Sequence, residues 1–459
     1  MKDYGRIGTV LTAAALFAGV TGAATAAFAQ SRGKAPLEDY VHEPMPAGIK
    51  VVVADFEGPV FADANGKTLY TWPVTPLRNG DAGEQKGKPT CGDVPSKVNA
   101  GLMSPYPGGL ELPEVDTRPA CTTMWPPVLA PADAKAIGKF TVVDRQDGKK
   151  QWAYDGYALY TSAFDEMPGD VRGGTKKKTT RGDSQGAGRE PAAPAENNPP
   201  QFKVSALQSG RLLTTSDSRS VYVSDRDAKG KSSCIGDCLN EWKPVPAPAS
   251  VQQQGDWTVI DHPTGIKQWA FRGQPVYTRN GDTKRPSLEG GDVSGWHNVY
   301  VTKPPAYPKG FAPQDMQSGM VLADAKGRTI YTYQCMDDAA DQLQCDYPEA
   351  PQVYRLSVSG RGDQAMSMKN FPYVIAEKGA ATTNRMWQVM AIDPKTGKKA
   401  AAGQQDALNV WAYRGRPVYY CARDKAAGDA ECDTWGEFYG WRNGYKAFWL
   451  RDDYGDNDE

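Results

Sequence analysis

One aromatic and acidic pattern occurs three times in the chain, and this repetition constrains the fold more than any other feature. Each copy has a tryptophan, a tyrosine eight residues later and an aspartate five residues after the tyrosine. The copies are Trp152/Tyr160/Asp165, Trp269/Tyr277/Asp282 and Trp411/Tyr419/Asp424. Repetition at matched spacing indicates one structural unit that has been duplicated, and a repeat has to be recognised before a fold is assigned.

The residues around each copy favour short strands joined by tight turns. Phe140 to Asp144 alternates and then turns through Asp147-Gly148 towards Trp152, and Trp257 to Asp261 turns through Thr264-Gly265 in the same way. This alternation with a turn glycine is typical of a β-hairpin. The tryptophans and the aromatic residues two positions later share one face of a strand, so we expect them in each core.

An upstream arm repeats as well. A glycine lies twelve residues before a tyrosine in three places: Gly58/Tyr70, Gly210/Tyr222 and Gly319/Tyr331. Two of these arms contain Asp-x-x-Gly turns, whereas the second has Thr215 and Ser218 there, which predicts a different turn. A tryptophan followed by proline or valine comes next in each module, at Trp125, at Trp242 and, more weakly, at Trp387.

These patterns predict an all-β protein of three tandem antiparallel modules, built from short strands and hairpins with irregular insertions. The modules span residues 50–173, 201–305 and 306–450, with long insertions at about 71–120 and 336–385. Residues 174–200 contain a lysine run and then Gly, Ser, Gln, Pro and Ala, which is typical of a flexible linker. Residues 451–459 form an acidic tail, expected to be solvated.

The first residues indicate export. An apolar, alanine-rich run ends in Ala27-Phe28-Ala29, so residues 1–29 are expected to be a signal peptide, with the mature chain beginning near Gln30. No later run is long enough to predict a membrane span in the mature chain. The net charge of −1 gives no reason to expect nucleic acid as a partner. We expect a periplasmic or secreted protein whose partner is an unknown periplasmic or cell-surface protein.

The eight cysteines fall into neighbouring couples, which in an oxidising compartment predicts four local disulfides. The couples are Cys91/Cys121, Cys234/Cys238, Cys335/Cys345 and Cys421/Cys432. Spacing alone does not prove this pairing.

Module two carries a combined motif that resembles a known family. It has Cys234-x3-Cys238-x3-Trp242-x-Pro244, with Tyr222/Asp227 and Tyr277/Asp282 as two Tyr-x4-Asp arms. This motif is similar to the bacterial secreted or lipoprotein repeats of unknown function, which occur in tandem. The resemblance implies export and repetition and supplies no catalytic residue. The chain departs from the family at Thr75 and Met336, which occupy the upstream aspartate position in modules one and three, and it lacks a lipid-bearing cysteine near the cleavage site.

Metal binding stays open as an alternative to a purely structural role. The aspartates Asp165, Asp282 and Asp424 fit turn caps that accept backbone N–H bonds. They also fit an acidic loop that binds calcium, although the full alternating calcium pattern is missing. Cys234 and Cys238 fit a small disulfide loop or a soft site for copper. No cofactor is expected otherwise.

The leading interpretation is an exported, non-enzymatic binding or interaction scaffold. With three histidines, none of them repeated, no catalytic triad recurs between the modules, and we name no catalytic residue. One alternative is a periplasmic metal-handling (copper) or redox accessory protein. A weaker alternative is a glycan-binding or glycan-cleaving protein, because the chain has twelve tryptophans.

Overall fold

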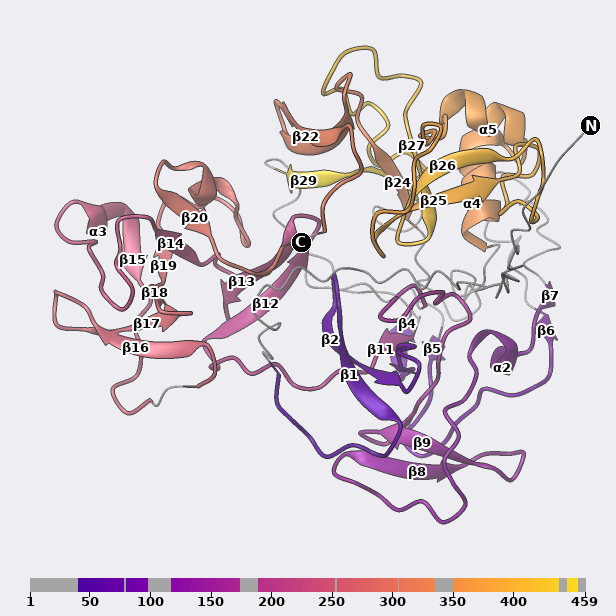
Figure 1. Ribbon diagram of the computed structural model, residues 1–459, viewed down its shortest axis with the longest axis horizontal. Coiled ribbons are helices and arrows are strands. Elements are labelled where there is room, and N and C mark those ends of the chain that lie inside the picture. Colours follow the sequence, from indigo (N-terminus) through magenta and orange to yellow (C-terminus); the bar gives the residue numbers. More distant parts are fainter. Residues whose placement is uncertain are drawn as a thin grey trace, which may run out of the picture. The chain divides into compact units, whose positions relative to one another are not determined.

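The computed structural model describes residues 40–77, 80–97, 117–173, 189–251, 254–303, 305–334, 350–436 and 444–452. The described residues form many small antiparallel sheets (Figure 1). The predicted all-β class is confirmed, since helices are few and short. The expected signal peptide lies outside the described residues, as does the expected tail beyond Asp452.

Module two shows the architecture most plainly. A hairpin of β12 and β13 leads to β14, which carries Tyr222, and a second hairpin of β16 and β17 leads to β19, which carries Tyr277. A short helix and β15 connect the two halves, and β20 and β21 end the module. The strands are β12 (Phe202–Leu207), β13 (Gly210–Thr215), β14 (Tyr222–Ser224), β15 (Trp242–Pro244), β16 (Trp257–Asp261), β17 (Lys267–Phe271), β18 (Gln274–Pro275), β19 (Tyr277–Arg279), β20 (Trp296–Asn298) and β21 (Tyr300–Thr302), with helix α3 (Cys238–Glu241) and the 3-10 helix Glu289–Asp292.

Each module therefore consists of two half-repeats. We define a half-repeat as a hairpin, a tyrosine strand, an acidic loop and a closing strand. In module two the halves span residues 202–245 and 257–302. The tyrosine-to-tryptophan spacing is 20 residues in the first half (Tyr222 to Trp242) and 19 in the second (Tyr277 to Trp296). The repeating unit is thus about half the size that the three-module interpretation predicts.

The two halves of a module exchange their closing strands. In the first half, Leu213 donates its N–H to the carbonyl of Val299, which comes from the end of the second half (2.8 Å). In the second half, Trp269 donates to the carbonyl of Val245, which comes from the end of the first (3.0 Å). Neither hairpin is completed by its own half-repeat, so the two halves depend on each other.

Module three follows the same plan with larger insertions. Its strands are β22 (Phe311–Met316), β23 (Gly319–Asp324), β24 (Tyr331–Gln334), β25 (Trp387–Ile392), β26 (Leu408–Tyr413), β27 (Arg416–Tyr419), β28 (Gly444–Ala447) and β29 (Trp449–Asp452). The insertion expected to be irregular contains two helices, α4 (Ala350–Gly360) and α5 (Gln364–Asn370). The first two residues of the expected tail belong to β29.

The predicted counterpart of Trp125 and Trp242 in module three is corrected. Val374 occupies the closing-strand position, because its N–H donates to Val418 and its carbonyl accepts from Trp411. Phe371, three residues earlier, therefore replaces the tryptophan. Trp387 instead begins the second hairpin, as Trp257 does in module two.

Module one contains β1 (Ile49–Ala54), β2 (Gly58–Asp63), β3 (Tyr70–Thr71), β4 (Thr75–Leu77), β5 (Gly80–Ala82), β6 (Ser96–Lys97), β7 (Thr117–Arg118), helix α2 (Cys121–Met124), β8 (Phe140–Asp144), β9 (Lys150–Tyr154), β10 (Tyr157–Ala158) and β11 (Glu190–Pro191). Its closing strand lies within the segment predicted to be a linker. Ala192 accepts from Phe61 and donates to Leu69, both at 2.8 Å, the same pattern that Val299 makes in module two. Module one thus extends past residue 173, and residues 174–188 lie outside the description.

The first-arm turns share one backbone shape, against the prediction for module two. Gly66 and Gly327 have positive φ of 86° and 77°, and Ser218 adopts 68° at the same place. Its hydroxyl accepts a hydrogen bond from Lys203 Nζ (2.7 Å). The conformational free energy needed to place one non-glycine residue at positive φ is small enough for the surrounding hairpin to offset.

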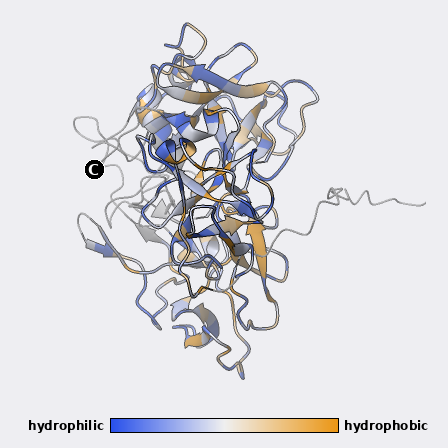
Figure 2. Cartoon of the chain, turned by 90° about the vertical axis from the view of Figure 1, so that its left-hand side faces the viewer, coloured by the Kyte–Doolittle hydropathy of each residue, from blue (hydrophilic) through white to orange (hydrophobic). Residues whose placement is uncertain are grey.

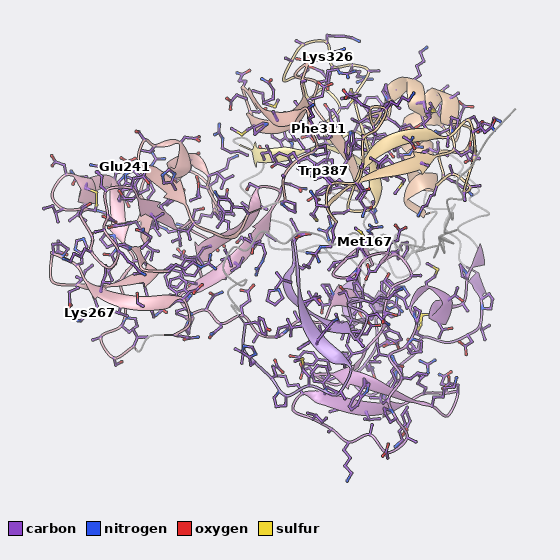
Figure 3. The ribbon with its side chains drawn as sticks, viewed as in Figure 1. Met167, Glu241, Lys267, Phe311, Lys326 and Trp387 are labelled. Carbon is purple, nitrogen blue, oxygen red and sulfur yellow. A yellow bond between two sulfur atoms is a disulfide. The ribbon has the colours of Figure 1, made fainter. Side chains whose placement is uncertain are left out.

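The cores contain the aromatic residues that alternation places on one strand face. Trp152, Trp269 and Trp411 are all buried. In Figure 3, Phe311 and Trp387 lie close to each other in module three, and their rings meet edge to face at 5.4 Å. Hydrophobic and hydrophilic segments are interleaved through the described chain (Figure 2), as expected where several small cores replace one large one.

Candidate functional site

The two tyrosines of a module face each other at its centre. Tyr222 and Tyr277 are direct partners across β14 and β19, and Tyr331 pairs with Tyr419 in the same way in module three. In module one, Tyr70 exchanges two backbone hydrogen bonds with its partner tyrosine (2.7 and 2.9 Å). All six side chains are buried. Burial raises the pKa of each phenol, so they stay protonated and can donate a hydrogen bond.

In module two the tyrosines bond to each other's aspartates. The Tyr222 hydroxyl donates to Asp282 Oδ2 at 2.9 Å, and the Tyr277 hydroxyl donates to Asp227 Oδ2 at 2.7 Å. Each Tyr-x4-Asp motif therefore binds its partner motif across the module. The sequence predicts the aspartates as turn caps but does not show this crossing.

Module one keeps the crossing with a different acid. Tyr70 donates to Asp165 (3.0 Å), and Tyr160 donates to Glu84 Oε1 (2.8 Å). Glu84 also accepts the backbone N–H six residues later, at 2.7 Å, as Asp227 does in module two at the same offset. The aspartate missing at Thr75 is thus replaced by a glutamate nine residues further along the insertion.

Module three keeps one crossing and changes the other. Tyr331 donates to Asp424 Oδ2 at 2.9 Å. On the opposite side, the guanidinium of Arg355 from α4 lies 5.4 Å from the ring of Tyr419 and bonds to Gln364 (2.7 Å) and to Ser367. An arginine network from the helical insertion therefore surrounds this tyrosine.

Stacked rings complete each centre. Trp242 and Trp296, which hold the same place in the two half-repeats, stack at 3.7 Å with an interplanar angle of 4°. Phe371 and Tyr445 stack at 3.5 Å in module three. In module one the partner of Trp125 is a cation: the Arg189 guanidinium lies 4.4 Å from the ring centre. The same central position thus tolerates two aromatic rings or a ring and an arginine.

The acidic loops use their carboxylates for backbone hydrogen bonds. Asp165 and Asp424 each accept the N–H seven residues later, at 2.9 and 3.0 Å. Asp170 and Asp429, five residues further on, each accept two backbone N–H bonds of 2.7–3.0 Å. In module two, Ser287 stands at that position, and its carbonyl shares the one proton of the Tyr222 hydroxyl with Asp282 (3.1 Å and 2.9 Å). These bonds make Asp165 and Asp424 turn caps as well as tyrosine partners, whereas Asp282 bonds to Tyr222 and lies 3.8 Å from the Arg279 guanidinium.

Burial has the largest effect on the pKa of each repeated aspartate. It raises the pKa of Asp165 to about 7, while the backbone N–H and the tyrosine hydroxyl act in the opposite direction. Burial likewise raises the pKa of Asp282 and of Asp424 to about 6. A protonated carboxyl at these positions still accepts the tyrosine bond.

Three of the four expected disulfides are present in the structure, joining Cys91 to Cys121, Cys234 to Cys238 and Cys421 to Cys432. Cys335 and Cys345 lie outside the described residues. The module-two cysteines are bonded to each other, so in this state neither is the thiolate that Cu(I) binds. In module three, Ser367 occupies the position of Cys121 and Cys238. The backbone carbonyl of each of these three residues accepts the N–H of the aromatic residue four positions later, which is Trp125, Trp242 or Phe371.

The candidate metal residues are not gathered into one place. Each of Asp165, Asp282 and Asp424 lies in its own module, beside a tyrosine. Over the ranges that the structure describes, no group of three or more His, Cys, Asp or Glu side chains is placed to hold a metal ion. In the same part of the chain, no helix is long and apolar enough to cross a membrane.

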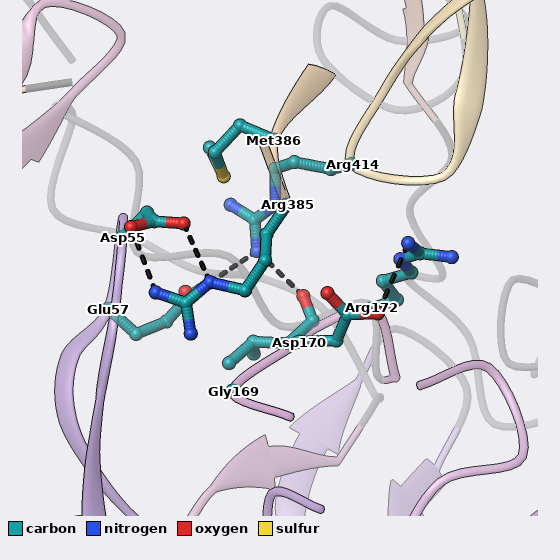
Figure 4. Close-up of a pocket in the computed structure, with 9 residues that line it drawn as sticks. Asp55, Glu57, Gly169, Asp170, Arg172, Arg385, Met386 and Arg414 are labelled. Carbon is teal, nitrogen blue, oxygen red and sulfur yellow. Dashed lines mark hydrogen bonds and ion pairs between the residues drawn. The ribbon is translucent and has the colours of Figure 1, made fainter. Parts of the chain in front are cut away.

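A charged pocket joins modules one and three (Figure 4). Arg385 donates to both carboxylate oxygens of Asp55 (3.0 and 3.1 Å), and Arg414 donates to Glu57. Arg172 pairs with Asp170 at 3.1 Å. The cavity among them has a volume of about 20 Å³, which is room for a single water. The pocket is therefore a network of ion pairs and not a ligand site.

Sequence reasoning missed Glu84, Arg355, Phe371 and the closing residue Ala192. The half-repeat itself could have been predicted from the sequence, because the tyrosine-to-tryptophan spacing occurs twice within module two. Glu84 and Arg355 lie inside insertions, where no spacing is shared between modules, so only the fold places them beside the tyrosines.

The fold and the buried centres define a mostly β protein of paired, mutually closed repeats. Residues 141–179 match the model of a family described as a secreted repeat of unknown function. The match runs through β8, β9 and β10 to Tyr160 and Asp165 and covers one half-repeat without its closing strand. The chain therefore carries a copy of this secreted repeat, and the expected resemblance is confirmed there. The family description and the disulfides indicate an extracytoplasmic location. No curated protein and no solved structure matched the chain.

Proposed function

We propose that the protein is an exported, non-enzymatic scaffold that presents its modules to a periplasmic or cell-surface partner, after removal of residues 1–29. One observation carries this proposal: the repeated polar side chains form hydrogen bonds within the protein itself. The tyrosines are buried, and each repeated aspartate accepts a hydrogen bond from one of them: Asp165 from Tyr70, Asp282 from Tyr222 and Asp424 from Tyr331. A catalytic group needs a free face towards substrate, which these residues do not offer.

The copper or redox alternative depends on Cys234 and Cys238 becoming thiols. The three residues between them are exposed, so a reductant can reach the loop. The calcium alternative depends on Asp282 and its counterparts exchanging their present partners for a cation.

Melting curves of the full chain with added calcium, added copper or a chelator test the proposal. We expect the melting temperature to be the same in all conditions, because a ligand that binds only the folded state would raise it. Asp282→Asn removes the candidate carboxylate, and Asp225→Asn, an exposed aspartate of the same module bonded to His297 (2.9 Å), is the matched control. A metal-dependent rise that Asp282→Asn abolishes and Asp225→Asn keeps would overturn the proposal.

A further inference from the structure

The turn between β26 and β27 of module three contacts both other modules. Tyr413 donates its hydroxyl to Gln208 of module two at 3.0 Å. Arg414 donates to Glu57 of module one and to the carbonyl of Val171 (2.9 Å), and its guanidinium lies 4.8 Å from the ring of Phe56. The three modules therefore meet around this turn.

A second, much larger cavity lies at this meeting point. Its volume is about 480 Å³, and residues of all three modules line it. This volume is in the range of small-molecule sites, which occur preferentially between domains. The charged pocket of Figure 4 borders it, since Glu57, Arg172 and Arg414 line both.

Most of the charges that line the large cavity are compensated within the protein. Glu57 pairs with Arg414, and Glu196 pairs with Arg211 at 3.2 Å. Arg172, whose side chain is 8 % exposed, pairs with Asp170 and Glu166. A charged ligand would have to compete with these pairs, whereas a neutral ligand would not.

The remaining lining suits a polyhydroxylated ligand. Tyrosine rings offer flat apolar faces with a hydroxyl at the edge, and four tyrosines from modules one and three line the cavity. They are Tyr154, Tyr157, Tyr333 and Tyr413. Nε of Arg172, which is buried, has no hydrogen-bond partner among the described residues and is a donor for a ligand hydroxyl.

We propose that this cavity binds a short neutral glycan, stacked on tyrosine rings and hydrogen-bonded to the edges of the arginine–carboxylate pairs. The inference rests on the proposed function and names the ligand class that the scaffold presents. The stacking surface is formed by the partly exposed tyrosines Tyr154, Tyr157 and Tyr413, because Tyr333 and the repeated tryptophans are buried in the module cores.

Calorimetric titration of the full chain with three neutral disaccharides, maltose, cellobiose and N,N′-diacetylchitobiose, tests it. We expect at least one to bind with millimolar or better affinity. Ala206→Trp, which fills the cavity from β12, should weaken that binding at least tenfold, and Ala228→Trp, at an exposed alanine of the same module that does not line the cavity, should not. Tyr157→Ala is the second variant, should Ala206→Trp fail to fold.

The proposal is overturned if none of the three sugars binds the parent chain, or if Ala206→Trp and Tyr157→Ala both bind as the parent does. Tighter binding of glucuronate than of the neutral sugars would contradict the charge argument and overturn it too. Failure here leaves the scaffold proposal standing. Cleavage of a bound disaccharide, seen as new reducing ends, would instead overturn the non-enzymatic function.

Discussion

At the scale of single residues, the structure explains why the same few side chains recur. A buried tyrosine hydroxyl needs an acceptor, and a buried carboxylate needs donors. The crossed bonds satisfy both needs with one contact, and Glu84 shows that the acceptor matters more than the residue that supplies it. A recurring Tyr-x4-Asp motif is therefore a packing requirement of the module centre.

Asp165→Asn tests the raised pKa of this buried carboxyl. Below about pH 4 the carboxyl is protonated in both the folded and the unfolded chain. Between about 4 and 7 the unfolded chain loses the proton and the folded chain retains it, because the folded pKa is about 7. The parent therefore loses stability as pH rises through this window, on the order of a few kcal/mol, and Asp165→Asn does not.

Chemical denaturation of the two proteins at pH 4, 5.5 and 7 measures the difference. We expect Asp165→Asn to gain stability relative to the parent at each step. A stability difference that stays constant with pH would show that the carboxyl ionises normally in the folded protein.

Trp269→Ala tests the assignment of the repeated tryptophans to the cores. Trp269 is fully buried and contacts Trp257 edge to face at 5.6 Å. Truncation should lower the stability of module two by about 3–5 kcal/mol, mainly from the cavity left behind. Ile266→Ala, at an exposed site on the same hairpin, should change stability by less than about 1 kcal/mol. Equal effects of the two substitutions would contradict the core assignment.

At the scale of elements, the sequence predicts hairpins well and closing strands poorly. The turn glycines and the alternation around Trp152 and Trp269 mark both partners of a hairpin, because the partners are close in sequence. A closing strand pairs with a hairpin from another half-repeat, so its register depends on distant residues. Ala192 illustrates the difficulty: it follows a lysine-rich segment typical of a linker, yet it occupies the position of Val299.

The disulfides should stabilise the modules unequally. Cys91–Cys121 closes 30 residues of chain and Cys234–Cys238 closes 4. In the chain-entropy account, the longer loop contributes about 2 kcal/mol more. Replacing each pair by alanines and comparing thermal unfolding should show the larger loss for Cys91–Cys121. A larger loss for Cys234–Cys238 would indicate that its role does not come from chain entropy.

At the scale of the whole molecule, the modules are joined by specific contacts that the repeat pattern does not predict. Phe56, at the turn between β1 and β2, packs against the core of module three, flanked by the ion pairs of Asp55 and Glu57. These residues belong to no repeat, since the corresponding turns of the other modules carry different side chains. The repeated residues therefore predict the modules, whereas residues outside the repeat, such as Phe56, form the contacts between modules.

Phe56→Ala should loosen the junction of modules one and three without unfolding either. We expect faster hydrogen exchange for the amides of residues 53–58 and 385–387, with unchanged exchange in module two. Val41→Ala, at an exposed valine that precedes module one, is the control. Unchanged exchange at the junction in Phe56→Ala would contradict the role given to this ring.

The central claim is that the aspartate of each Tyr-x4-Asp motif bonds to the tyrosine of the other half-repeat and not to the tyrosine of its own motif. A double-mutant cycle in module two measures this directly, with local stability taken from hydrogen exchange of the β14 and β19 amides. Tyr222→Phe combined with Asp282→Ala should show a coupling free energy of about 1–2 kcal/mol, because the two side chains share a partly buried hydrogen bond. Tyr222→Phe combined with Asp227→Ala should be additive within about 0.5 kcal/mol. Strong coupling of Tyr222 to Asp227, with none to Asp282, would contradict the account.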